Sequence, residues 1–354
     1  MAPILLNAVA LFAGGSGVQT YTHELVAALP DAAPAQPFAA MIDAEAAGLL
    51  PSQIAPRVVR ADSGWRRKLL GIRSVRDAAL VHGLDVDVPW SSTVPRVATV
   101  HDLSLFDTPW ATSKLGGVVK RRLTARACKS AEAVIAVSTF TAERIAQRFG
   151  RDATVVHEAP RARFRPPVPD AIEAVRARLR LPERFVLHLG NLEPRKDVAT
   201  LAAACDAAGV PLVLAGGAIR TVDVPRGATA LGYVADDDLP ALFAAATVVG
   251  YVSRYEGFGL PPIEALACGA VVMATRVGAL AEVAPEGIEF VAIGDIDAQA
   301  RALRELFHDV ARGEALRTKG LVEVSRLSWA RAARETVDVY RKFVTVPAAP
   351  SPSA

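Results

Sequence analysis

The sequence predicts an α/β protein made of two units, each with a parallel sheet between helices. Short apolar segments of strand length alternate with Ala- and Leu-rich helical segments along the chain, and no fixed-period repeat is present. At 354 residues the chain is long for one hydrophobic core and suits two domains of ordinary size. The segment 160–170 is rich in Pro and Arg, which favours a linker between the units.

Each unit has its own series of expected elements. In the first half, strands buried on both faces are expected at 4–9, 38–42, 79–82, 97–100 and 133–137, and helices at 21–29, 115–129 and, capped by Ser138, 141–149. In the second half, strands are expected at 185–189, 211–215, 247–252 and 271–274, and helices at 198–208, 239–246 and 262–267. A final amphipathic helix over 328–343 would bury Trp329, Ala333, Val337 and Tyr340, and the tail 347–354 is expected to be disordered.

Composition excludes several classes of protein. A net charge of +3 is too small to indicate a nucleic-acid partner. The cysteines Cys128, Cys205 and Cys268 are far apart and match neither a metal-ligand spacing nor a disulfide framework, so a reducing, cytoplasmic setting is expected. The first residues carry no basic leader, and no apolar run reaches membrane-spanning length.

The segment 255–269, Y-E-G-F-G-L-P-P-I-E-A-L-A-C-G, is the most informative in the chain. Its glycines and the pair Pro261-Pro262 predict a turn that leads into a helix starting near Pro261, and such a helix start suits a phosphate. Glu256 would precede this anion site and Glu264 would lie in the first helical turn. Two simpler interpretations remain open: a solvated helix face carrying both glutamates, or Glu264 as a complement to the helix dipole.

This segment resembles the Glu-x7-Glu signature of retaining glycosyltransferases of family 4, which have the GT-B fold. The resemblance implies that Glu256 lies by the donor sugar, that Glu264 binds the ribose hydroxyls, and that the N–H groups of Phe258, Gly259 and Leu260 hold the diphosphate. It also implies two facing Rossmann-like domains. An acceptor domain would span 1–165 and include a returning helix at about 330–345, and a donor domain would span 170–329.

A glycine loop, G-G-S-G-V-Q-T, follows the first expected strand. It lacks the Gly-Lys-Ser/Thr of a P-loop, but it is one letter short of the dinucleotide fingerprint, and Asp43 ends the next strand. An NAD-dependent protein and a plain turn are therefore alternatives. The loop is similar to the family's N-terminal loop beside the donor diphosphate and acceptor, which implies binding roles for Gly15, Ser16 and Gly17.

His101 ends an expected strand, at the sheet edge that faces the ligand crevice in parallel sheets. The segment V-H-D-L is similar to the family's strand-end His-Asp motif, whose His contacts the donor sugar near the reacting carbon. Asp102 could orient His101 or cap the following turn. A purely structural histidine is the alternative.

The segment L-H-L-G-N-L-E-P-R-K-D is similar to the family loop that neutralises the donor diphosphate. Lys196 matches the family's Lys. Many members have Arg where this chain has Asn191, so Arg195 could supply the second cation. The alternative, that these are surface charges at a helix start, is disfavoured because cations are unfavourable at a helix N-terminus.

Near Gly232, the segment L-G-Y-V resembles the family segment whose backbone holds the nucleotide base, which implies Gly232, Tyr233 and Val234 as binding positions. Asp236, Asp237 and Asp238 are then expected to form a helix N-cap and first turn. We interpret this run and the pair Asp85 and Asp87 as local structure, not as a metal site, and His188 as a strand residue.

Two basic stretches, 65–76 and 114–129, carry Lys and Arg with Leu and Val between them and no acidic residue. A solvated helix face is the simpler interpretation. The alternative is a peripheral contact with anionic lipid headgroups through Arg66, Arg67, Lys68, Lys120, Arg121 and Arg122, which would bring a lipid-linked acceptor to the enzyme.

Taken together, the resemblance implies a retaining glycosyltransferase that moves a hexose from a nucleotide-diphosphate sugar to a glycan or lipid-linked acceptor, without a metal or other cofactor. The V-H-D-L and L-E-P-R-K segments look most like bacterial mannosyltransferases of surface polysaccharide assembly, which favours GDP-mannose over UDP- or dTDP-sugars. The alternatives are a sugar-nucleotide epimerase of the same fold, an NAD-dependent oxidoreductase and a binding-only relative. The expected location is the cytoplasm, with contact at the inner face of the membrane as a further hypothesis.

Overall fold

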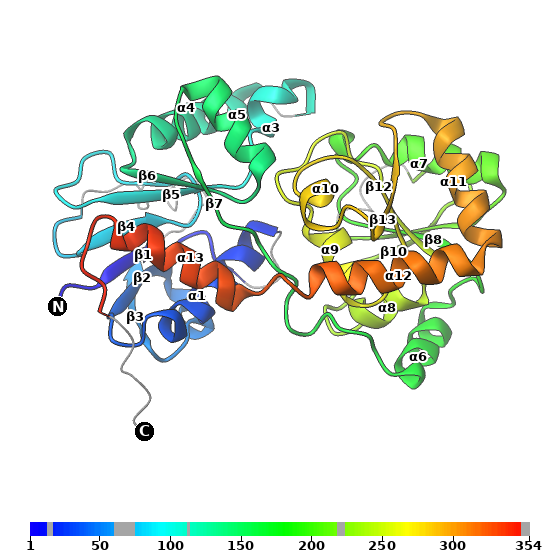
Figure 1. Cartoon of the computed structure of the whole chain (residues 1–354), viewed down its shortest axis with the longest axis horizontal. Helices are drawn as coiled ribbons and strands as arrows, with labels where there is room; N and C mark the ends of the chain where they lie inside the picture. The colour runs from blue at the N-terminus through cyan, green and yellow to red at the C-terminus, as the bar shows by residue number, and fades with distance from the viewer. Residues whose placement is uncertain (13–16, 60–74, 112–113, 218–223, 348–354) are drawn as a thin grey trace. The chain divides into compact units, whose positions relative to one another are not determined.

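The computed structural model describes residues 1–12, 17–59, 75–111, 114–217 and 224–347 (Figure 1). The chain divides into two compact units. Unit 1 comprises Met1–Glu158 and Ser328–Ala354, and unit 2 comprises Ala159–Leu327. The predictions for Gly15, Ser16, Arg66, Arg67, Lys68 and the tail from 348 lie outside the described residues.

Unit 1 contains a parallel sheet in the order β3-β2-β1-β4-β5-β6-β7. Its strands are β1 (Ile4–Asn7), β2 (Phe38–Asp43), β3 (Ile54–Val59), β4 (Leu80–Gly83), β5 (Arg96–Val100), β6 (Ala133–Ala136) and β7 (Thr154–Val155). Its helices are α1 (Gly17–Ala32), η1 (Ala44–Leu49), α3 (Ser104–Asp107), η2 (Pro109–Ala111), α4 (Lys114–Ser130), α5 (Thr139–Phe149) and α13 (Trp329–Arg341). The expected cap of α5 is confirmed, because the Ser138 hydroxyl accepts a hydrogen bond from the Thr141 amide at 3.0 Å.

Helix α13 returns to unit 1 and packs against α1, which confirms the expected returning helix. Ser328 caps its start by accepting a bond from the Arg331 amide at 3.2 Å. The side chains predicted to face the core are all buried, namely Trp329, Ala333, Val337 and Tyr340. The Tyr340 hydroxyl lies 2.6 Å from His82 Nδ1 in β4, so this helix is fixed to the sheet by a buried polar contact as well as by apolar packing.

Unit 2 repeats the plan with a parallel sheet in the order β10-β9-β8-β11-β12-β13. Its strands are β8 (Val186–Leu189), β9 (Leu212–Ala215), β10 (Thr229–Gly232), β11 (Val248–Tyr251), β12 (Val272–Thr275) and β13 (Ile288–Val291). Its helices are α6 (Pro169–Leu179), η3 (Pro194–Lys196), α7 (Val198–Ala208), α8 (Leu239–Ala245), α9 (Leu260–Ala267), α10 (Leu280–Val283), α11 (Ile296–His308) and α12 (Val310–Val324).

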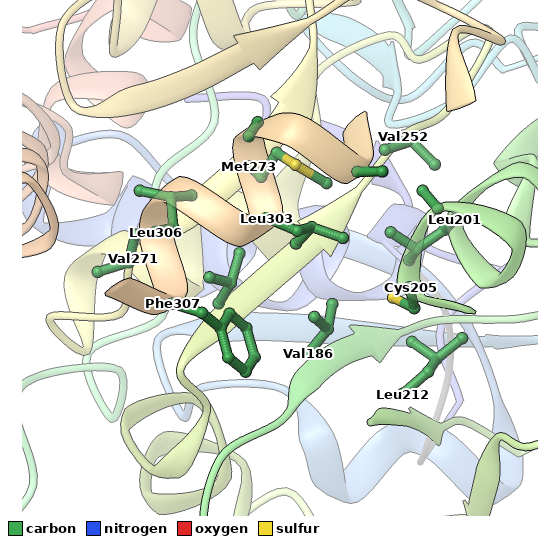
Figure 2. Close-up of a cluster of buried hydrophobic side chains, with 14 of the residues drawn as sticks. Val186, Leu201, Cys205, Leu212, Val252, Val271, Met273, Leu303, Leu306 and Phe307 are labelled. Carbon is green, nitrogen blue, oxygen red and sulfur yellow. The ribbon is translucent and has the colours of Figure 1, made fainter. Parts of the chain in front are cut away.

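The core of unit 2 lies between its sheet and the helix pair α7 and α11, which pack against each other. Figure 2 shows this cluster, in which side chains of β8 and β9 meet those of α7 and α11: Val186, Leu201, Cys205, Leu212, Leu303, Leu306 and Phe307. Each β8 residue from Val186 to His188 is buried, as expected for a central strand of a parallel sheet, and His188 is a strand residue, as predicted. The predicted class, two parallel α/β units, is therefore confirmed.

Candidate functional site

The sheet order of unit 2 reverses between β8 and β11, which are neighbours in the sheet although 58 residues or more of chain separate their ends. In open α/β sheets, ligands bind outside the carboxyl ends of the strands at such a reversal. The loops that follow these two strands are joined directly. The Arg254 amide donates to the Arg195 carbonyl at 2.8 Å, and Arg195 Nη1 donates to the Tyr255 carbonyl at 3.1 Å.

Glu256 is the centre of a buried charged cluster at this point. Its Oε1 accepts hydrogen bonds from Lys196 Nζ and Ser253 Oγ, both at 2.6 Å, and its Oε2 accepts one from Arg195 Nη1 at 3.0 Å. Burial raises the pKa of Glu256, but Lys196, Arg195 and Ser253 outweigh burial and lower it to about 2. Glu256 is therefore ionised at neutral pH and held in one orientation.

Lys196 is 8% exposed, so the surface-charge interpretation of this residue is wrong. Its Nζ also donates to the Tyr251 hydroxyl at 2.6 Å and lies 4.8 Å from the centre of the Tyr251 ring. Burial works against the ammonium, yet the carboxylate of Glu256 raises the pKa of Lys196 above its ordinary value. Tyr251 and Ser253 were not predicted to contact Lys196 and Glu256. Their position at the end of the strand expected at 247–252 could have indicated these contacts.

Asn191 and Arg195 differ in their surroundings. Arg195 is partly buried within the Glu256 cluster. Its Nε also donates a hydrogen bond at 2.9 Å to the exposed side chain of Glu193. Asn191 is exposed on the same loop. The structure therefore brings Arg195 and Lys196 together on one carboxylate.

The turn after Glu256 leads into α9, as predicted, but the helix starts at Leu260, one residue early. Gly259 caps it with φ +105°, a backbone conformation that only glycine adopts without strain. The Ala279 amide donates to the Phe258 carbonyl at 3.0 Å, and a Cβ on Gly278 would lie 2.8 Å from that same oxygen. The segment after β12 thus supports the turn through close backbone contact.

Glu264 lies just beyond the first turn of α9, which corrects the prediction and removes the basis for a dipole-complementing role. Glu264 is 4% exposed and Glu256 is 7% exposed, so the interpretation that both glutamates lie on a solvated helix face is also wrong. The carboxylate instead meets Arg161, whose Nε donates to Glu264 Oε1 at 2.8 Å. Burial raises the pKa of Glu264 to about 7, and Arg161 opposes that rise.

The acidic run before α8 forms ion pairs, which corrects its expected capping role. Asp238 stands at the N-cap position but makes no side-chain cap bond. The three carboxylates pair with arginines from the preceding linker and α6: Asp236 with Arg161, Asp237 with Arg163 and Asp238 with Arg178. Sequence reasoning did not identify Arg161 as a site residue.

The proposed base-binding segment follows β10. Gly232 ends that strand with φ +71°, and its carbonyl accepts the Gly216 amide at 2.8 Å. Tyr233 is 67% exposed, whereas Val234 is buried. Because β10 lies at the sheet edge, two strands from β8, this segment is separated from the Glu256 cluster by the breadth of β9 and β8.

In unit 1, His101 follows β5, as predicted. Its Nε2 lies 2.9 Å from the Leu84 carbonyl, its Nδ1 lies 3.2 Å from Glu158 Oε1, and Tyr21 packs edge-on against its ring. Since both neighbours are acceptors, both ring nitrogens must carry protons. Asp102 does not orient the ring and instead caps the next turn by accepting bonds from the Ser104 amide and hydroxyl at 2.8 and 2.6 Å.

We expect His101 to titrate far above an ordinary histidine. Burial disfavours the charged ring, but the bond and charge of Glu158, with Asp85, raise its pKa from 6.5 to about 9. The stability from this pair is present below pH 6.5 and lost as pH rises through about 9. Histidine NMR titration should place the midpoint near 9, and Glu158→Gln should lower it. A wild-type midpoint at or below 6.5 contradicts this assignment.

The other unit 1 predictions have mixed outcomes. Gly17 is the first residue of α1, as expected for a loop that opens a helix. Asp43, which supported the NAD-dependent alternative, accepts a hydrogen bond from the Glu45 amide at 3.2 Å and caps η1. Its carboxylate therefore has a local structural role. Lys120 and Arg122 are exposed on α4, whereas Arg121 Nη1 donates to the Leu105 carbonyl at 3.2 Å. In the described part of the chain, no helix combines the length and hydropathy that crossing a membrane requires.

Comparisons with known proteins agree on one class. Models described as Glycosyltransferase Family 4 and Glycosyl transferases group 1 match residues 15–162 and 172–320. O-antigen chain mannosyltransferase B of Escherichia coli is 29% identical over 296 residues, 78% of this chain and 77% of that protein. Alpha-maltose-1-phosphate synthase of Mycobacterium tuberculosis is 31% identical over 284 residues, 70% of this chain and 73% of that protein. The solved structure of Anabaena HepE in complex with UDP-glucose has a TM-score of 0.75 at 17% identity, covering 97% of this chain and 100% of that chain.

The two parallel-sheet units and these matches define a glycosyltransferase of the GT-B fold. The chain belongs to glycosyltransferase family 4, so it is an enzyme of the transferase class. We therefore set aside the oxidoreductase, epimerase and binding-only alternatives.

Proposed function

We propose that this enzyme transfers a hexose, with retention, from a nucleotide-diphosphate sugar to a glycan or lipid-linked acceptor, and that GDP-mannose is the first donor to test. The observation that carries the proposal is that Lys196 and Arg195 both donate hydrogen bonds to the carboxylate of Glu256, which immediately precedes the turn into α9. The relatedness to a mannosyltransferase of O-antigen chains supports a mannose donor.

In this proposal the chemistry is mostly positioning and electrostatics. The acceptor oxygen bonds to the anomeric carbon as the bond from that carbon to the diphosphate oxygen breaks, and the acceptor proton passes to the departing diphosphate. Lys196, Arg195 and the amides of Phe258, Gly259 and Leu260 stabilise the charge that grows on the diphosphate. These cations are proposed to act without a metal ion.

The carboxylates divide two tasks. Glu256, ionised and fixed by three donors, orients the cations and the donor sugar. Glu264, in helix α9, accepts hydrogen bonds from the ribose hydroxyls. The contact of His101 with the sugar, and the roles of Gly17, Gly232, Tyr233, Val234 and Asn191 toward the donor, stay predictions.

Thermal unfolding with GDP, UDP, dTDP and NAD tests the proposal. A ligand at about 100 times its Kd stabilises by about 2.7 kcal/mol, which raises Tm by several degrees. We expect GDP to give the largest shift and NAD none. The nucleotide that shifts Tm should then be released from its sugar only when an acceptor is present, and NMR of the product should show a retained anomeric configuration. A shift with NAD alone contradicts the proposal.

We also propose that α4 contacts anionic lipid headgroups in the cytoplasm, because Lys120 and Arg122 are exposed beside the exposed Val118 and Val119. Changing Lys120 and Arg122 together to Glu should lower partitioning onto vesicles containing anionic lipid at least several-fold, since each basic residue near the surface contributes about 1 kcal/mol. The double variant Arg301→Glu/Arg326→Glu, with the same charge change on exposed sites of unit 2, is the control. Equal partitioning of wild type and the α4 variant would end this proposal.

A further inference from the structure

Arg161 joins two carboxylates that belong to different parts of unit 2. Its Nε donates to Glu264 Oε1 at 2.8 Å, and its Nη1 donates to Asp236 Oδ2 at 2.6 Å. Its guanidinium lies over the Phe164 ring, 4.6 Å from the ring centre. Three different contacts therefore fix this side chain, and only 16% of it is exposed.

Arg161 leaves part of the Glu264 carboxylate available. Oε1 accepts a well-formed bond, whereas Oε2 is 3.5 Å from Nη2, a distance too long for a strong one. A carboxylate has about four acceptor positions. The two side-chain contacts and a bond from the Arg161 backbone occupy three of them, which leaves one for a ligand. A vicinal pair of ribose hydroxyls supplies donors of the required kind.

Burial makes the guanidinium necessary. Glu264 lies almost out of water, where a charged carboxylate is costly unless it is paired. A protonated carboxyl would offer its own donor and lose acceptor capacity toward hydroxyls. The charged form, which binds hydroxyls more strongly, thus depends on Arg161.

We propose that Arg161 is a positioning residue for nucleotide binding, which holds the Glu264 carboxylate in the orientation that accepts the ribose hydroxyls. This inference rests on the proposed function and assigns the specificity for the intact ribose to the pair of Arg161 and Glu264. The linker, as well as the Glu-x7-Glu segment, then contributes to the donor site.

The other charged groups around Glu264 are few, so its titration should report mainly on Arg161. Helix α8 and strand β12 carry no ionisable side chain. The remaining neighbours are already engaged: Asp236 pairs with Arg161, Tyr251 of β11 with Lys196, Arg317 of α12 with the Gly269 carbonyl, Glu323 of α12 with the Gly287 amide, and the Cys268 thiol is buried. Asp236 raises the pKa of Glu264, in the opposite direction to Arg161.

Calorimetric titration tests the proposal with two probes: the nucleoside diphosphate that stabilises wild type, and its 2′,3′-dideoxy analogue. Arg161→Gln should raise Kd for the first about tenfold near neutral pH, a loss of about 1.4 kcal/mol, and leave Kd for the analogue unchanged. Arg161→Lys should restore only part of the affinity, because it keeps the charge but cannot bond to Glu264 and Asp236 together. The ratio of the Kd of the analogue to the Kd of the nucleoside diphosphate cancels the titration of the phosphates themselves. This ratio should fall on acidification, with a midpoint near 7 in wild type and a higher midpoint in Arg161→Gln, and it should not vary with pH in Glu264→Gln.

The double variant Arg161→Gln/Glu264→Gln separates this role from a structural one. If Arg161 acts through Glu264, adding its substitution to Glu264→Gln should change Kd less than twofold, because the target of Arg161 is already gone. Equal loss for both probes, an undiminished Arg161 effect in the Glu264→Gln background, or an unchanged Kd in Arg161→Gln would each overturn the proposal. Failure of wild type to bind any nucleoside diphosphate would instead overturn the proposed function.

Discussion

Replacing Glu256 by Gln is expected to lower kcat about 10²–10³-fold, the usual loss when one preorganised electrostatic group is removed. The substitution keeps the shape of the side chain but deletes the charge that gathers Lys196 and Arg195. Lys196 keeps its bond to the Tyr251 hydroxyl and Arg195 keeps its bond to the Tyr255 carbonyl, so nucleotide affinity should change far less than turnover. Initial rates across donor concentrations, with calorimetry for the nucleoside diphosphate, separate the two quantities.

Glu193→Gln is the matched control for this variant. Glu193 also pairs with Arg195, at 2.9 Å, but its carboxylate is 46% exposed, so its pairing energy is small. Turnover of the control should stay within about twofold of wild type. Wild-type kcat in Glu256→Gln would refute the role assigned to Glu256.

Lys196→Met is expected to destabilise unit 2 by about 3 kcal/mol, at the lower end for breaking a buried ion pair, because Arg195 still compensates Glu256. The variant should also bind the nucleoside diphosphate at least tenfold more weakly, since it lacks a cation proposed to contact the phosphates. Urea unfolding measures the first effect and calorimetry the second.

Arg254→Met tests whether any cation near these loops would serve. Arg254 belongs to the same pair of loops, but it bonds to Asp197 at 2.9 Å and its side chain is 42% exposed. We expect little change in affinity. Stability should fall, because the Asp197 side chain is only 10% exposed and loses its ion partner. Equal loss of affinity in both variants would show that general positive charge, and not Lys196 itself, attracts the nucleotide.

Sequence reasoning predicted the interior of each sheet better than its edges. The strands β3, β7, β10 and β13 were not predicted, and each lies at an edge of its sheet. Edge strands have one edge open to solvent and are less completely covered, so they lack the continuous apolar run that reveals a central strand. Ile54–Val59 and Thr229–Gly232 illustrate this, because most of their residues are partly or fully exposed.

Among the helices that were not predicted, the three longest are α6, α11 and α12, and each was missed for a local reason. Helix α6 begins at Pro169, inside the segment interpreted as linker, because Pro is tolerated in a first turn as well as in a loop. Helices α11 and α12 are separated only by Asp309, which caps α12 by accepting a bond from the Arg312 amide. With so short a break, periodicity alone marks neither boundary.

The candidate site could be predicted where adjacent strands bring its parts together. Lys196 and Glu256 are 60 residues apart, yet both follow strands that pair in parallel at the sheet reversal. Arg161 and Glu158 had no such signal. Arg161 reaches Glu264 across 103 residues from a segment without regular structure, and Glu158 reaches His101 across 57. The partners of Arg161 and Glu158 depend on the path of an irregular segment through the folded chain, and no local sequence pattern predicts that path.

A crystal structure of the enzyme with the nucleoside diphosphate that raises its Tm would show where the diphosphate and the ribose bind. We expect diphosphate oxygens within hydrogen-bond distance of Lys196 Nζ and of the Phe258–Leu260 amides, with the ribose hydroxyls on Glu264. A nucleotide bound elsewhere, with Lys196 still held only by Glu256 and Tyr251, would contradict the account.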